Sequence, residues 1–142
     1  MVTSFMHREG PVTAGDTRTA LVTQGATAAP GVIKVPTWAK RIVTLTVAVG
    51  DNTPTAADGG HNYLVTLSGD GMIDGDQTMC VGSCSSDFTT AGDTGVGGRC
   101  FQTYNVDINV EANGIVNIYG EATLGVLFGQ PEFGVTIQFA SQ

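Results

Sequence analysis

The sequence predicts an all-β protein: a two-sheet antiparallel sandwich, either a jelly roll or a related Greek key, with about eight to ten strands. Apolar and polar residues alternate along several short segments, which is the period of a strand with one face on a core. Gly occurs 20 times in 142 residues, as expected where many short strands are joined by tight turns. No domain linker or fixed repeat interrupts the chain, so we expect a single β-sandwich domain over residues 1–142.

The N-terminal strands are expected at residues 2–7, 18–24 and 31–35. Segments such as GATAAPG lie between strands, since they carry Gly and Pro. The longest strand follows in RIVTLTVAV, whose alternation places on one face Val43, Leu45, Val47 and Val49. The same pattern in YLVTL predicts a strand whose core face carries Tyr63, Val65 and Leu67.

The stretch GDGMIDGDQTMC, residues 69–80, has the acidic and glycine content of a calcium loop. An EF-hand loop beginning at Asp70 would need an oxygen ligand at its third position and Glu at its twelfth, where Met72 and Val81 stand. We therefore interpret the stretch as two Asp-Gly turns leading into a strand at residues 72–81. A different calcium site stays open, built between loops from Asp70, Asp74 and Asp76.

The second half of the chain alternates most clearly. In YNVDINV one face carries Tyr104, Val106, Ile108 and Val110. In FGVTIQF one face carries Phe133, Val135, Ile137 and Phe139. Asn113-Gly114 is a hairpin signal, and a three-residue loop, Ala112-Asn113-Gly114, sets Val110 opposite Val116. This predicts a hairpin with Gly114 in the left-handed conformation.

A further strand is expected at residues 122–128, and it differs in having apolar residues on both faces. Leu124, Val126 and Phe128 share one parity, whereas Leu127 has the other. A sandwich strand needs only one apolar face, so another subunit covers the second face, or another part of the same chain does.

The chain lacks the residue patterns of an enzyme. It has two histidines and no G-x-S-x-G motif, and no helix follows the glycine-rich GDTGVGG at residues 92–98. His61 is expected at the start of a strand. We therefore predict no catalytic residues, no metal site and no cofactor.

Three cysteines leave two alternatives open, because the spacing of Cys80, Cys84 and Cys100 does not fit a zinc site. Either all three are thiols, or one disulfide forms with one cysteine left over. A bridge from Cys84 to Cys100 would close the loop between them.

Charge limits the partners of the chain. Six basic residues stand against 13 acidic ones, for a net charge of −7, so we expect no direct nucleic-acid binding. No apolar run approaches the roughly 18 residues of a membrane span. The N-terminal sequence MVTSFMHREGPVTAGDTRTA does not have the pattern of a signal peptide.

The segment GVIKVPTWAKRIVTLTVAVG, residues 31–50, resembles small virion proteins built from a single jelly roll. In those coat and decoration proteins a short strand ends in Val-Pro, and a turn of small residues leads into a long strand. The resemblance implies a structural subunit of a virion or similar shell, with localisation in the virion. It also implies a homo-oligomer, with other shell proteins as further partners.

Contacts in such a shell should be apolar and polar-uncharged, since the chain has few cations to oppose its neighbours' carboxylates. We expect the subunit interface to include Trp38, Phe88 and Leu127. The alternative function is a non-catalytic carbohydrate-binding module, in which Trp38 would contact the sugar. Host, copy number, symmetry and partner shell are not encoded in any pattern of the sequence.

Overall fold

The computed structural model describes residues 1–12, 18–23, 31–51, 61–84, 98–123 and 131–142, which contain nine strands and no helix. The strands are β1 (Thr3–Pro11), β2 (Thr19–Ala20), β3 (Ile33–Lys34), β4 (Arg41–Asp51), β5 (His61–Ser68), β6 (Gln77–Cys84), β7 (Gly98–Asn109), β8 (Ile115–Thr123) and β9 (Glu132–Ala140). The expected all-β sandwich is confirmed.

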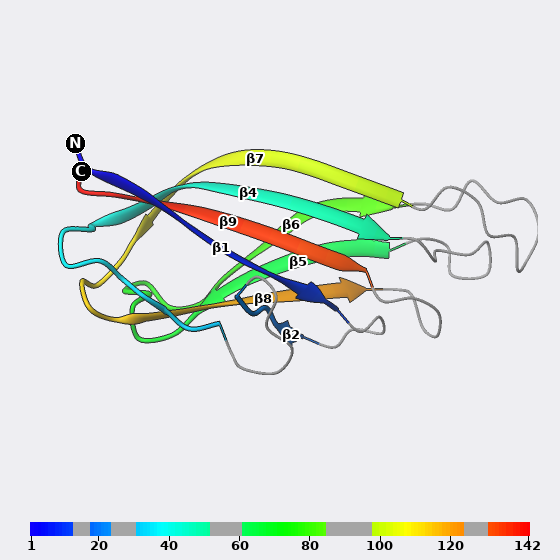
Figure 1. The fold of residues 1–142 in the computed structure, drawn as a ribbon, viewed down its shortest axis with the longest axis horizontal. Coiled ribbons are helices and arrows are strands. Elements are labelled where there is room, and N and C mark those ends of the chain that lie inside the picture. The colour runs from blue at the N-terminus through cyan, green and yellow to red at the C-terminus, as the bar shows by residue number, and fades with distance from the viewer. Residues whose placement is uncertain (13–17, 24–30, 52–60, 85–97, 124–130) are drawn as a thin grey trace, which may run out of the picture.

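Two antiparallel sheets face each other (Figure 1). One has the order β1-β9-β4-β7, and the other has the order β2-β8-β5-β6, with β3 also paired to β8. Because β2 and β3 both pair with β8, they act as one interrupted strand. The strands then pair from the ends of the chain toward its middle: β1 with β9, the interrupted strand with β8, β4 with β7, and β5 with β6. A long hairpin folded over in this way is a jelly roll.

The core lies between the sheets and is built from the residues whose alternation predicted it. Tyr63, Val65 and Leu67 are buried, as are all four apolar residues of FGVTIQF. The Tyr63 and Phe133 rings meet edge to face across the two sheets, with centroids 5.7 Å apart. Tyr104, Val106 and Ile108 are half-buried against this core. Parity therefore predicted the inward face of these strands correctly.

A β-bulge changes the predicted face of β4. The register shifts between Ile42 and Thr44 against both neighbouring strands. Ile42 is fully buried, whereas Val43, which the alternation placed on the core face, is only half-buried. A bulge inserts one residue and reverses parity on one side of it.

The predicted hairpin between β7 and β8 is wrong, because these strands belong to different sheets. Val110 forms an isolated bridge with Met72, and Val116 pairs with Ile33. The connection does contain a turn, closed by a hydrogen bond from the Gly114 amide to the Glu111 carbonyl at 3.0 Å. An apolar pattern on two successive strands fits a crossing between sheets as well as it fits a hairpin.

The left-handed residue of this turn is Asn113, with φ of 64°, and the expectation for Gly114 is wrong. Gly114 is required for another reason: a Cβ there would lie 2.5 Å from the Cα of Gly71. The turn after β7 thus packs its backbone directly against the turn after β5.

The stretch 69–80 forms turns, as expected, but β6 begins only at Gln77. Before it, Met72 makes the isolated bridge to Val110. Of the strand expected at residues 122–128, the first two residues are the end of β8, and residues 124–130 lie outside the described residues.

Candidate assembly surface

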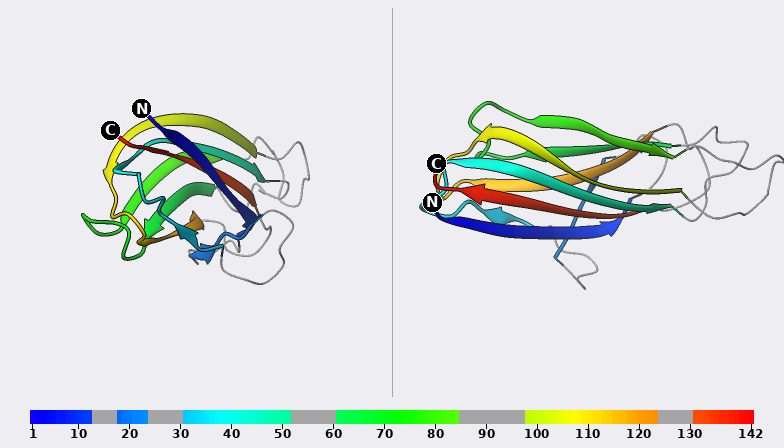
Figure 2. Two further views of the ribbon diagram at one scale, coloured as in Figure 1. Left: turned by 60° about the vertical axis from the view of Figure 1, so that its left-hand side comes forward. Right: turned by 90° about the horizontal axis from the view of Figure 1, so that it is seen from above.

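The middle of the outer face of the sheet β1-β9-β4-β7, here named the outer sheet face, carries few charged side chains. Its strands point their apolar residues inward, so the alternate residues of each strand face away from the core. The register aligns them in three rows of four: Phe5, Gln138, Thr44 and Asn105; His7, Thr136, Thr46 and Thr103; Glu9, Gly134, Ala48 and Phe101. Figure 2 shows this sheet as a continuous twisted layer on one side of the molecule.

Polar side chains on neighbouring strands of the outer sheet face are hydrogen-bonded to one another. His7 Nδ1 and Thr136 Oγ1 are 2.8 Å apart, and Thr46 Oγ1 and Thr103 Oγ1 are 2.9 Å apart. Thr44 Oγ1 donates to Gln138 Oε1 at 3.1 Å. These hydrogen bonds join protein groups and do not depend on water. Burying this face therefore costs less free energy than burying the same polar groups without partners.

Two exposed phenylalanines lie at opposite corners of the outer sheet face. Phe5 on β1 is 64% exposed and Phe101 on β7 is 77% exposed. They are separated by three strand spacings and two rows, or about 20 Å. Large apolar side chains this exposed are natural contact points for another surface.

Charge is sparse within the three rows, where Glu9 carries the one carboxylate. His7 Nε2 lies 3.8 Å from Glu9 Oε2. Beyond the rows at one end, Arg41 pairs with Asp107 at 2.9 Å and also donates to the Gln142 carbonyl. At the other end, the next row consists of Pro11, Glu132, Gly50 and Arg99, in which Glu132 is exposed. The three rows are therefore polar and carry a single carboxylate, on a chain whose net charge is −7.

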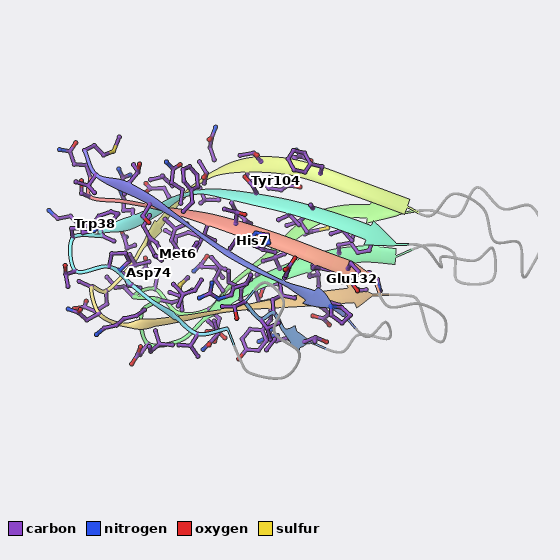
Figure 3. All side chains as sticks on the ribbon, viewed as in Figure 1. Met6, His7, Trp38, Asp74, Tyr104 and Glu132 are labelled. Atoms are coloured by element: carbon purple, nitrogen blue, oxygen red, sulfur yellow. The ribbon has the colours of Figure 1, made fainter. Side chains whose placement is uncertain are left out.

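Of the three residues predicted for the interface, the structure describes only Trp38. It lies in the turn between β3 and β4 (Figure 3), at the end of the molecule where Figure 1 marks both termini. Its side chain is half-buried and packs against the core. Phe88 and Leu127 lie outside the described residues, so the predicted interface stays a prediction.

Sequence reasoning missed the two exposed phenylalanines, although one signal could have found Phe101. Continuing the alternation of YNVDINV backwards places Phe101 and Thr103 on the same solvent face as Asn105. An aromatic residue on a face that is otherwise polar indicates a contact site. No comparable pattern marks Phe5, because the neighbouring residues of β1 do not alternate clearly.

Two of the three aspartates of the stretch 69–80, Asp70 and Asp74, are engaged in hydrogen bonds within the chain. Asp70 Oδ1 accepts from the Ile115 amide at 2.6 Å, and Asp74 Oδ2 accepts from Asn109 Nδ2 at 3.3 Å. Among the residues that the structure describes, no three His, Cys, Asp or Glu side chains lie close enough to hold a metal ion.

The remaining residues singled out from the sequence are dispersed. His61 opens β5, as expected. Cys80 is exposed on β6, whereas Cys84 and Cys100 are placed in β6 and β7 by their backbone alone. In the described part of the chain there is no helix of the length and hydropathy that a membrane span needs.

The strand order and the core define a jelly-roll β-sandwich protein. No family model matches the sequence, and a search of curated proteins finds no relative. Among solved structures, one of Bacillus endospore appendages, described as a novel family of disulfide-linked pili, is similar at a TM-score of 0.38. It is 12% identical, and the match covers 99% of this chain and 88% of that one.

A second similar structure is of infectious bursal disease virus, Gx strain, with a TM-score of 0.38 and 9% identity. That match covers 96% of this chain but 31% of the viral chain, so the present chain spans about a third of its length. Similarity at this level identifies neither a family nor a function.

Proposed function

We propose that the protein is a non-catalytic structural subunit of a virion or similar protein shell, as a coat or decoration protein. It assembles with copies of itself through apolar and uncharged polar contacts. The observation that supports this most directly is the outer sheet face, on which three pairs of polar side chains are hydrogen-bonded across strands and whose corners carry Phe5 and Phe101.

The basic residues also support assembly through uncharged contacts, because three of those whose side chains are described already interact with other groups of the same chain. Arg8 donates to the carbonyls of Gly31 at 2.6 Å, His7 at 2.6 Å and Val32 at 3.2 Å. Arg41 is paired with Asp107, and the Arg18 guanidinium lies 5.7 Å from the Tyr119 ring centroid. Salt bridges between subunits would therefore contribute little to assembly.

The acidity of the chain also limits what such a shell encloses. At −7 per subunit, contact with a phosphate backbone is repulsive. The proposed subunit therefore decorates another shell, or encloses something other than bare nucleic acid.

The described residues do not favour the alternative of a carbohydrate-binding module. Trp38 is half-buried against the core, and the two exposed phenylalanines lie about 20 Å apart at opposite edges of a sheet. A sugar platform needs aromatic rings side by side on one surface.

Sizing chromatography with light scattering, at several salt concentrations, tests the proposal. We expect an oligomer at micromolar concentration that persists or grows as salt is raised, because salt screens the repulsion between subunits over about 8 Å at physiological ionic strength. A monomer in moderate salt would refute the proposed function, and so would an oligomer that dissociates when salt is added.

A further inference from the structure

We infer that two copies of the chain pair through their outer sheet faces about a two-fold axis that runs along the line from Phe5 to Phe101. The pairing rests on the proposed function, and it names one of the contacts through which the subunits assemble. Each phenylalanine then meets its own counterpart in the partner copy, at opposite ends of the contact.

The positions of the two rings follow from the register. Phe5 lies on β1 in the first row, and Phe101 lies on β7 in the third row. The midpoint between them falls at the central pair of strands, beside Thr46 and Thr136. The central strands β9 and β4 of this sheet are visible in Figure 1. The two exposed rings thus lie at equal distances on opposite sides of the centre of the surface.

Only two in-plane two-fold axes through this centre bring aromatic rings together. An axis along the line between the rings places Phe5 on Phe5 and Phe101 on Phe101 of the second copy. An axis perpendicular to that line places Phe5 on Phe101. A two-fold contact of either kind is self-complementary and closed, as in most homo-oligomers.

Charge selects between the two axes. The perpendicular axis brings Glu9 of one copy against Glu9 of the other, and two like charges facing each other repel. The axis along the line between the rings instead brings Glu9 against Asn105, whose amide can donate a hydrogen bond to a carboxylate. Under the same operation His7 faces the uncharged pair Thr44 and Gln138. No like charges from the three rows then oppose each other.

The crossing angle of the two sheets follows from the same geometry. The line between the rings runs across three strand spacings, about 14 Å, and along two rows, about 13 Å, so it lies near 45° to the strands. A two-fold axis at this angle makes the paired sheets cross at about 90°, which is one of the two known arrangements of packed sheets.

The predicted contact is small. Four strands crossing four strands overlap over a square with sides of about 19 Å, or roughly 700 Å² counted over both copies, which is below the about 1,200 Å² of a stable specific interface. A single contact of this size gives a weak pair, so it is expected to work together with other contacts of a shell.

Photo-crosslinking tests the pairing directly. The photoreactive residue p-benzoylphenylalanine replaces Phe5 in one sample and Phe101 in another, each in a mixture of ordinary and ¹⁵N-labelled protein, so that mass spectrometry identifies links between chains. Both sites are exposed, so the fold is expected to be retained. We expect the Phe5 probe to link to β1 near Phe5 of another copy, and the Phe101 probe to link near Phe101. The control probe replaces Ile73, which is 55% exposed in the turn before β6, and should give no link to the outer sheet face.

A charge exchange provides the second test. Asn105→Asp should lower the yield of the Phe5 link about fivefold, because it sets two carboxylates against each other in the pair. Adding Glu9→Gln should restore the yield. Asn113→Asp makes the same change of charge in a turn off this face, at a φ that Asp tolerates, and should leave the yield unchanged.

The outcomes separate the pairing from the function on which it rests. An oligomer whose Phe5 probe links to Phe101, or to residues outside the outer sheet face, would overturn the pairing and leave the proposed function standing. The same holds if Asn105→Asp has no effect on the link. A chain that stays monomeric and gives no links overturns both.

Discussion

At the scale of single residues, close contacts between backbones explain why two glycines meet in this fold. Gly114 and Gly71 approach so closely that a Cβ on Gly114 would lie 2.5 Å from the Cα of Gly71. A neighbouring backbone cannot turn aside as a flexible side chain can. The glycine is needed for space, and the positive φ of the turn belongs to Asn113.

We therefore expect Gly114→Ala to lower the free energy of unfolding by about 1–3 kcal/mol, and Gly114→Val to lower it at least as much. Thermal unfolding monitored by circular dichroism measures the effect. Gly50→Ala is the control, since a Cβ at Gly50 meets no atom within 4 Å. An unchanged melting temperature for Gly114→Ala would show that the two turns do not pack as described.

Arg8 holds the strand β1 to the segment before β3 by donating to the carbonyls of Gly31 and Val32, and it also donates to the carbonyl of its neighbour His7. Burial lowers the pKa of its guanidinium, but an arginine remains charged across the accessible pH range. We expect Arg8→Lys to destabilise the protein by about 1–2 kcal/mol, because an ammonium cannot reproduce the planar fork of donors. Urea unfolding measures the loss. Equal stability of Arg8→Lys and the wild type would show that the three carbonyls do not depend on the fork.

At the scale of elements, the outer sheet face joins side chains from four strands that are far apart in the sequence. Thr46 of β4 lies at its centre, between Thr136 of β9 and Thr103 of β7. A charge placed there must be desolvated when another surface covers it.

Thr46→Lys should therefore weaken assembly at least tenfold, since a buried unpaired charge costs more than about 1.4 kcal/mol. Light scattering as a function of concentration measures the change. Ile73→Lys adds the same charge off this face and serves as the control. If both variants assemble like the wild type, the outer sheet face is not the contact surface.

At the scale of the whole molecule, the fold is expected to be independent of calcium. Asp70, the residue with which a calcium loop would begin, instead accepts a hydrogen bond from the amide of Ile115, the first residue of β8. Melting temperatures with and without EDTA should agree. A fall of several degrees in EDTA would show that a metal ion stabilises the fold.

The amino-acid sequence alone was sufficient for most of the strands and for the inward faces of β5, β7 and β9. Alternation is a property of a few consecutive residues. The patterns FGVTIQF and YLVTL therefore identify the buried face of each strand without any knowledge of the strand's position in the sheets. Net charge is likewise independent of the fold, so the expectation of no nucleic-acid contact needed only the composition. The approximate number of strands, and with it the sandwich class, followed from the same local signals.

Only the tertiary structure decided which strands pair. The alternation of residues shows which side chains of β7 point inward. It does not show which strand lies beside β7, because strand pairing depends on contacts between distant parts of the chain. The predicted β7–β8 hairpin therefore proved to be a crossing between sheets. The bulge at Val43 is visible only in the pairing of β4 with its two neighbours, because the register shifts there against both. The outer sheet face exists for the same reason: residues as far apart as His7 and Thr136 become neighbours when the first strand pairs with the last.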